Sequence, residues 1–70
     1  MAESVYKIIE LVGTSTESWE AAARSAVERA SSTLRDLRIA EVEKLDMTVD
    51  NKKEALYRAK IKLSFKYEEG

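Results

Sequence analysis

The amino-acid sequence predicts an α+β fold in which a single helix packs on a three-stranded antiparallel sheet, in the order β-α-β-β. Three segments predict it: a β-branched stretch over residues 5–12, an alanine-rich stripe with helical spacing over 19–34, and an alternating stretch over 55–67. A right-handed crossover between the first two strands leaves the third strand between them, so the expected strand order is 1-3-2. Residues 1–70 are expected to form one small domain, with tails at 1–4 and 68–70 that fray.

The first strand is expected over Val5–Val12, a segment rich in β-branched and aromatic residues that ends at a glycine. Gly13 indicates a turn between this strand and the helix. Thr14, Ser15 and Thr16 are three consecutive candidates for the helix N-cap, and Thr14 with Glu17 matches a capping box.

The helix is expected to run for about twenty residues and to end between Leu34 and Leu37. Small alanine side chains favour the helical conformation and allow a helix to lie close to a sheet. Trp19, in the first turn, is expected to pack in the core or against another subunit rather than to hold a ligand. The apolar stripe consists of Trp19, Ala22, Ala23, Ala26, Val27, Ala30 and Leu34.

The second strand is expected over Arg38–Val49. Its apolar residues change parity near Glu43–Leu45, which predicts a β-bulge there. Residues 50–53 are expected to form the turn into the final strand.

The final strand, Ala55–Tyr67, is the longest and is expected to be central. Its polar face carries a cationic row: Arg58, Lys60, Lys62 and Lys66. This row is expected to be a solvated sheet face, with phosphate or nucleic-acid binding as the lesser alternative. Its apolar face consists of Ala55, Tyr57, Ala59, Ile61, Leu63, Phe65 and Tyr67.

The length of this strand predicts self-association. At about 3.3 Å per residue it spans roughly 43 Å, whereas a helix of about twenty residues is roughly 30 Å long. The chain has no cysteine, so neither a disulfide nor a thiolate metal site can stabilise so small a domain. Other subunits are therefore expected to cover the remaining apolar surface.

Composition excludes several classes of function. A net charge of −1 gives no general attraction to nucleic acid. No apolar run reaches the length of a membrane span and no signal peptide opens the chain, so we expect a cytoplasmic protein without a membrane partner. The chain has no histidine and only two glycines, and the carboxylates of Glu41 and Glu43 are expected to be solvated. We therefore expect no enzymatic activity.

One group of oxygen ligands lies near the second turn. Asp46, Asp50, Asn51 and Glu54 could hold a hard cation such as calcium, although a solvated turn is the alternative interpretation. The candidate metal ligands are Asp46, Asp50 and Glu54.

Several motifs together resemble the dodecins, over Val5–Glu68. The resemblance implies a hollow homododecamer of cubic symmetry that binds or stores a ligand without catalysis. Many dodecins hold pairs of flavins at two-fold contacts. The motifs are Val12-Gly13-Thr14-Ser15, Arg29-Ala30, Thr33-Leu34, Ala40-Glu41-Val42 and Phe65.

The resemblance also identifies two altered positions of the flavin site. Ile39 stands where flavin-binding dodecins have a stacking tryptophan, and isoleucine has no π face. Arg58 stands in place of a glutamine that hydrogen-bonds the flavin, and arginine has no acceptor. A dodecin subgroup associated with calcium is closer, through Thr14-Ser15, Ser18-Trp19-Glu20, Asp46-Met47, Val49-Asp50 and Tyr57-Arg58.

The resemblance therefore implies a dodecamer that binds calcium or another small cation rather than flavin. Flavin sequestration and a purely structural shell are the two alternatives.

Overall fold

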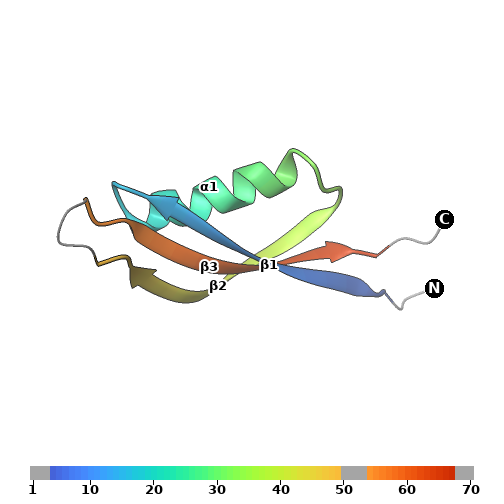
Figure 1. The fold of residues 1–70 in the computed structure, drawn as a ribbon. Coiled ribbons are helices and arrows are strands. Elements are labelled where there is room, and N and C mark those ends of the chain that lie inside the picture. The colour runs from blue at the N-terminus through green and yellow to red at the C-terminus, as the bar shows by residue number, and fades with distance from the viewer. Residues whose placement is uncertain (1–3, 50–53, 68–70) are drawn as a thin grey trace.

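The structure, a computed structural model, describes residues 4–49 and 54–67. The elements follow in the order β1 (Tyr6–Ser15), α1 (Trp19–Ser31), β2 (Leu37–Met47) and β3 (Tyr57–Lys66). They form a three-stranded antiparallel sheet in the order β1-β3-β2, and α1 lies along one face of it (Figure 1). The predicted α+β class, the element order, the strand order and the central place of the final strand are confirmed.

The core lies between α1 and β3. On the helix side three alanines are buried, and on the strand side three alternate residues in the middle of β3 are buried, as the alternation predicts. Because alanine projects only a methyl group, the helix approaches the sheet closely. The buried set is Ala22, Ala26, Ala30, Ala59, Ile61 and Leu63.

Gly13 marks the closest approach of β1 to the helix. A Cβ atom at this position would lie 2.0 Å from the carbonyl oxygen of Ala22. The glycine is therefore required by packing and not by a turn. β1 continues through it to Ser15, which pairs with Tyr57, so the predicted end of the strand at Val12 was wrong.

The predicted N-cap was also wrong. The cap is Ser18, whose Oγ accepts a 2.9 Å hydrogen bond from the N–H of Ala21. Thr14 and Ser15 belong to β1, so Thr14 cannot form a capping box with Glu17. Because Thr14 and Ser15 pair with Arg58 and Tyr57 of β3, they stay extended, and the helix cannot begin until Ser18.

The helix is shorter than expected, with 13 residues rather than about twenty. Serine and threonine side chains at 31–33 bond to carbonyl oxygens within the last turn, which offers the backbone an alternative to further helix. Asp36 then adopts a left-handed conformation, with φ of 58°, as the chain turns into β2. Leu34 still packs against the core, although it lies beyond the helix.

The predicted bulge in β2 is confirmed. The register steps from Val42 opposite Ile61 to Lys44 opposite Lys60, which leaves Glu43 as the extra residue. A second irregularity, between Leu37 and Ile39, was not predicted. The predicted turn at 50–53 lies outside the described residues, as do tail residues 1–3 and 68–70.

The helix covers only part of its side of the sheet. It packs on β1 and β3 and meets β2 least. Val42, Leu45 and Met47 of β2 lie on the helix side but are 52%, 50% and 40% exposed. The radius of gyration is 14.6 Å, against roughly 11 Å for a compact domain of this length. The part of the chain that the structure describes contains no helix long and apolar enough to cross a membrane.

Candidate functional site

The candidate site lies on the face of the sheet opposite α1, which we call the open face. Side chains alternate along each strand, so residues between the buried ones point to this face. Cross-strand partners share a face, which places polar rows across the three strands. These rows are Glu10–Lys62–Glu41, Val12–Lys60–Lys44 and Thr14–Arg58–Asp46.

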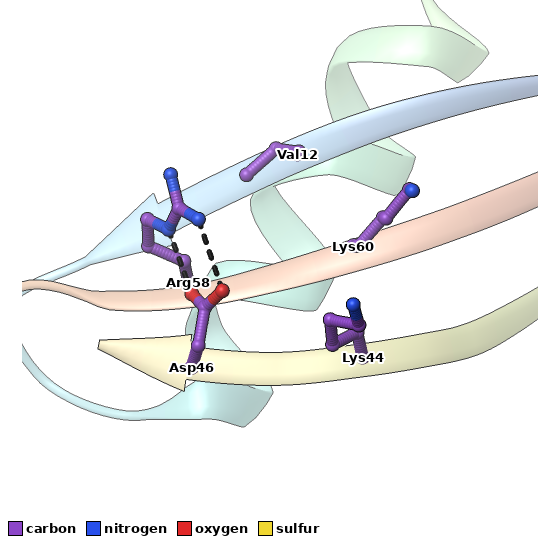
Figure 2. A pocket seen from close by; sticks show the side chains of 5 residues that line it. All are labelled: Val12, Lys44, Asp46, Arg58 and Lys60. Atoms are coloured by element: carbon purple, nitrogen blue, oxygen red, sulfur yellow. Dashed lines mark hydrogen bonds and ion pairs between the residues drawn. The ribbon is translucent and has the colours of Figure 1, made fainter. Parts of the chain in front are cut away.

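The strongest polar contact of this face joins β2 and β3. The guanidinium of Arg58 donates to both carboxylate oxygens of Asp46, from Nε to Oδ1 at 2.7 Å and from Nη2 to Oδ2 at 2.9 Å (Figure 2). This bidentate geometry matches the planar fork of arginine to the carboxylate. The hydrogen bond from Arg58 lowers the pKa of Asp46, and the same bond raises the pKa of Arg58. Both side chains are less than half exposed, at 42% and 44%.

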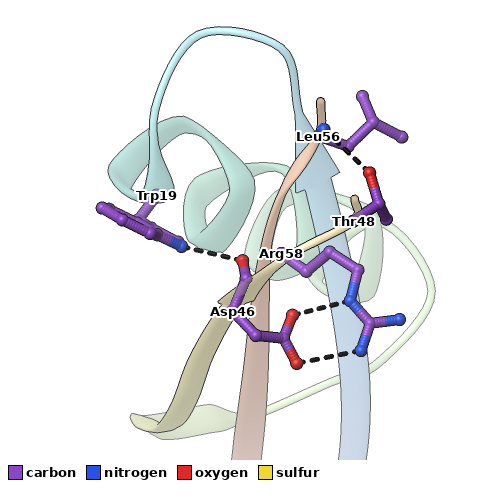
Figure 3. Close-up of polar contacts among 5 residues, drawn as sticks. All are labelled: Trp19, Asp46, Thr48, Leu56 and Arg58. Carbon is purple, nitrogen blue, oxygen red and sulfur yellow. Dashed lines mark hydrogen bonds and ion pairs between the residues drawn. The ribbon is translucent and has the colours of Figure 1, made fainter. Parts of the chain in front are cut away.

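On the helix side of the sheet, the main chain of Asp46 is bonded to Trp19. The indole Nε1 of Trp19 donates a 3.0 Å hydrogen bond to the carbonyl oxygen of Asp46 (Figure 3). The Trp19 ring meets the ring of Tyr57 edge-on, with centroids 4.9 Å apart and planes at 73°. Asp46 therefore joins two contacts, one to the helix through its backbone and one to Arg58 through its side chain.

Beyond the ends of the strands, Thr48 and Leu56 extend the pairing toward the turn. The N–H of Leu56 donates to Oγ1 of Thr48 at 2.9 Å (Figure 3). The N–H of Thr48 donates to the Leu56 carbonyl oxygen, also at 2.9 Å. These two bonds hold β2 and β3 together next to Asp46 and Arg58.

A second ionic group crosses all three strands. The bulge residue Glu43 lies 2.9 Å from Lys62 and 3.4 Å from Lys60, and Lys60 lies 3.6 Å from Glu10. The hydrogen bond from Lys62 is the main cause that lowers the pKa of Glu43, and the same bond raises the pKa of Lys62. Three of the four residues in the predicted cationic row are thus paired with carboxylates, which leaves little net positive charge on this face.

A shallow hollow of about 290 Å³ lies on the open face at Asp46 and Arg58 (Figure 2). Val12, Lys44 and Lys60 complete its lining. It is large enough for a small ion with its water, and the paired Asp46–Arg58 side chains occupy its floor.

Of the three predicted metal ligands, the structure describes Asp46 and Glu54. Asp46 has oxygens of the kind that calcium prefers, but both accept hydrogen bonds from Arg58. Glu54 is exposed, while Asp50 and the neighbouring Asn51 lie outside the described residues. Over residues 4–49 and 54–67, no three acidic side chains gather at one point. The ligand chemistry fits calcium, although the described carboxylates alone do not form a cage, and the ligand set stays a prediction.

The two altered flavin positions lie at different places on the open face. Ile39 is opposite Ser64 and is 60% exposed, whereas Arg58 is opposite Asp46. The two rows are six positions apart along β3, which is about 20 Å along a strand. One chain therefore does not bring Ile39 and Arg58 into a single pocket.

Sequence reasoning missed two contacts of the site. It assigned Asp46 to a metal site and Arg58 to a flavin site, although both flank one predicted hairpin. Counting outward from the expected turn at 50–53 would have placed Asp46 opposite Tyr57, whereas the observed register places it opposite Arg58. The contact of Trp19 with Asp46 had no such signal, because it joins residues 27 positions apart through a main-chain oxygen.

These features define a small β-α-β-β protein with one helix-covered sheet face and one ionic, open face. The chain belongs to the dodecin family, whose model, described as Dodecin, matches residues 5–68.

Similar proteins agree with this assignment. The chain is 49% identical over 63 residues to calcium dodecin of Mycobacterium tuberculosis, a match that covers 90% of this chain and 89% of that protein. A crystal structure of a calcium dodecin from that organism, described as calcium-chelating with a novel calcium-binding site, is similar with a TM-score of 0.84, 48% identity and 93% of each chain covered. The dodecin of Streptomyces coelicolor is similar with a TM-score of 0.88 at 37% identity, with 100% of each chain covered.

Proposed function

We propose that this chain is the subunit of a non-enzymatic homododecamer that binds calcium or another small cation, and that it does not store flavin. The observation that carries the proposal is the Asp46–Arg58 pair. At the position equivalent to a flavin-binding glutamine, the chain has an arginine whose donors are directed at a neighbouring carboxylate.

The argument against flavin rests on what the two positions can offer. Ile39 has no aromatic plane for an isoalloxazine ring to stack on, which removes on the order of 1 kcal/mol or more. Arg58 can donate but cannot accept, and its Nε and Nη2 are already engaged. Neither residue can reproduce the contact that the resemblance assigns to its position.

The argument for a cation rests on oxygen ligands beside the β2–β3 turn and on the relative named calcium dodecin. Asp46, Asp50 and Glu54 are the proposed ligands. Bound calcium would supply positive charge that ties these carboxylates together, and the chain would supply the oxygens. The pairing of Thr48 with Leu56 holds β2 and β3 in register at the ends of the two strands, next to the proposed ligand Asp46.

Assembly is the second part of the proposal. The exposed side chains of Val42, Leu45 and Met47 on the helix side of β2 are apolar surface that a single chain does not cover. Burial against neighbouring subunits would remove this surface from water, at about 25 cal/mol for each Å².

Calorimetric titration of the metal-stripped protein with calcium chloride tests the function, with magnesium chloride as the comparison. We expect heat of binding and a higher melting temperature with calcium, because a ligand that binds only the folded state stabilises it. No heat and no change in melting up to millimolar calcium would contradict the proposal.

Two further measurements separate the alternatives. Added riboflavin should keep its fluorescence, whereas quenching would favour flavin sequestration. Light scattering should give about twelve times the 7.9 kDa mass of the chain. A dodecamer that binds neither calcium nor flavin would leave only the structural shell.

A further inference from the structure

We propose that a second copy of this chain covers one row of the open face, Ile8–Ser64–Ile39, through a two-fold symmetric contact. We call it the isoleucine row. This inference rests on the assembly part of the proposed function, because it names a second surface through which subunits meet. The pairing of β1 and β2 with β3 places Ile8 and Ile39 on either side of Ser64. The two isoleucines are 58% and 60% exposed in the single chain.

The isoleucine row differs in chemistry from the rest of the open face. Among the rows that the described strands form on this face, it is the only one without a charged side chain. Exposed apolar side chains bordered by polar ones are typical of protein–protein contacts. The other rows are Tyr6–Lys66, Glu10–Lys62–Glu41, Val12–Lys60–Lys44 and Thr14–Arg58–Asp46.

The shape of the row suits a contact between two sheets. Sheets that pack face to face lie about 10 Å apart, a distance that apolar side chains from both sheets fill together. Ile8 and Ile39 supply such side chains on the two outer strands. Ser64, between them on the central strand, is small and does not hold the two copies apart.

The charges beside the row favour one orientation of the second copy. Lys66 lies on one side of the row, and on the other side Glu10, Lys62 and Glu41 together carry one net negative charge. A two-fold axis that runs across the strands at Ser64 reverses the second copy along the strand direction. Lys66 of each copy then lies over the acidic row of the other. An axis along the strands would instead place like charges over one another, which is unfavourable.

Lys66 and Glu41 are available for this contact. Within residues 4–49 and 54–67, neither side chain takes part in an ion pair. Both residues are exposed. A second copy can therefore pair with them without breaking an ion pair of the described chain.

A closed shell needs a second contact of this kind. A two-fold contact by itself ends at a dimer, and a head-to-tail contact by itself ends at a ring. The exposed Val42 and Leu45 lie on the helix side of β2, whereas the isoleucine row lies on the opposite face of the sheet. Different copies can therefore occupy the two surfaces at the same time.

The first test places a charge in the row and measures the mass of the full chain by light scattering and analytical ultracentrifugation. We expect Ile39→Lys to give a smaller species at micromolar concentration, because a lysine would be buried without a partner. Its circular dichroism should stay unchanged, since position 39 is exposed in the single chain. The matched control, Val12→Lys, changes another exposed apolar residue of the open face and should keep the wild-type mass.

A charge exchange tests the orientation. Lys66→Glu should raise the protein concentration at which half of the assembly dissociates by roughly tenfold, because exposed ion pairs are weak. Lys66→Glu/Glu41→Lys should return that concentration to within about twofold of the wild type. Lys66 and the row of Glu41 are four positions apart along β3, about 13 Å, so contact within one chain does not explain a recovery.

Two results would overturn the inference: an Ile39→Lys protein with the wild-type mass, or a double variant that assembles no better than Lys66→Glu. Binding of anilinonaphthalene sulfonate identifies a different occupant. If the assembled wild type binds this dye and an Ile39→Lys assembly of equal mass does not, the row is a small-ligand site and the self-contact is rejected.

Failure of the proposed function is read separately, from the wild type. A dodecamer that Ile39→Lys leaves whole rejects this contact but not the assembly. A wild-type dimer that Ile39→Lys separates rejects the dodecamer and supports the contact. A wild-type monomer rejects both.

Discussion

Two halves of the same sheet face carry similar apolar side chains but have different environments. Under α1, Ile61 and Leu63 of β3 are 1% exposed. On the adjacent strand β2, Val42 and Leu45 point to the same side and are 52% and 50% exposed. Leu63 and Leu45 are the same residue type on adjacent strands. Leu63 lies on the central strand beneath the helix, whereas Leu45 lies on an edge strand that the helix meets least.

The contrast shows that α1 buries the apolar side chains of β3 but leaves those of β2 exposed. Three small alanines bring α1 close to β1 and β3. The helix meets β2 least, although Trp19 in its first turn bonds to Asp46 of that strand. The covered half is buried within one chain, whereas the uncovered half leaves its apolar side chains exposed.

The largest expected effect comes from Leu63→Ala in the covered half. Removal of a fully buried leucine leaves a cavity against the alanines of α1, so the free energy of unfolding should fall by about 3 kcal/mol. Leu45→Ala, the same change in the uncovered half, should cost a chain that is not assembled less than about 1 kcal/mol. Urea unfolding followed by circular dichroism at fixed protein concentration measures both. Equal losses would show that the two halves are not distinct.

The next effect comes from Gly13→Ala, which adds atoms to the covered half. The new Cβ would lie 2.0 Å from a backbone oxygen of α1, so the helix must move away from the sheet. Overpacking of this kind should cost about 1–3 kcal/mol. Thr14→Ala, one residue later and on the open face, is the control in the same unfolding experiment. A Gly13→Ala variant as stable as the wild type would contradict the close packing of helix and strand.

The contrast also explains which parts of the fold could be predicted from the sequence. The alternation within residues 55–67 and the alanine stripe are set by burial within one chain, and both patterns were found. The strand bounds were wrong: β3 is Tyr57–Lys66 rather than Ala55–Tyr67, and β2 is Leu37–Met47 rather than Arg38–Val49. The helix boundaries were also wrong, because Thr14 and Ser15 are good caps in isolation and only pairing with β3 keeps them extended. Gly13 was assigned to a turn because the sequence does not show that Ala22 lies above it.

The site could be predicted less well than the fold. The residue types indicated a group of carboxylates and a row of cationic side chains. They did not indicate that these carboxylates and cations pair with one another. The bulge at Glu43 shifts the register of β2 against β3 on the side away from the turn. One residue more or less between Asp46 and Arg58 would place Arg58 opposite a different partner. Which carboxylate meets which cation is therefore decided by tertiary pairing and not by local sequence.

A charge in the uncovered half should break the assembly without unfolding the chain. In Leu45→Asp the carboxylate remains solvated in the free subunit, but it would be buried without a partner at a subunit contact. Light scattering should show the loss of the dodecamer, while the far-ultraviolet circular dichroism keeps its helix and strand signals. Ser25→Asp, which adds the same charge on the exposed side of α1, should assemble normally. A Leu45→Asp protein that still forms a dodecamer would show that this half is not a subunit contact.

The smallest expected effect belongs to the open face and depends on pH. Lys62 and Lys60 lower the pKa of Glu43, so its contribution to stability is present above its unfolded value, about 4.3, and is lost as the pH falls through the lower folded value. Lys62 has a raised pKa, so its contribution is present below about 10.4 and is lost as the pH rises through the higher folded value. Glu43→Gln should remove the first dependence and reduce the second, because Glu10 and Glu41 also raise the pKa of Lys62. The fold should change little, since these side chains are accessible to water. Melting temperatures between pH 3 and 11 measure the effect, with Glu28→Gln on the exposed side of α1 as the control. If Glu43→Gln loses as much stability at pH 7 as Leu63→Ala, the open face holds the sheet together as strongly as the core does.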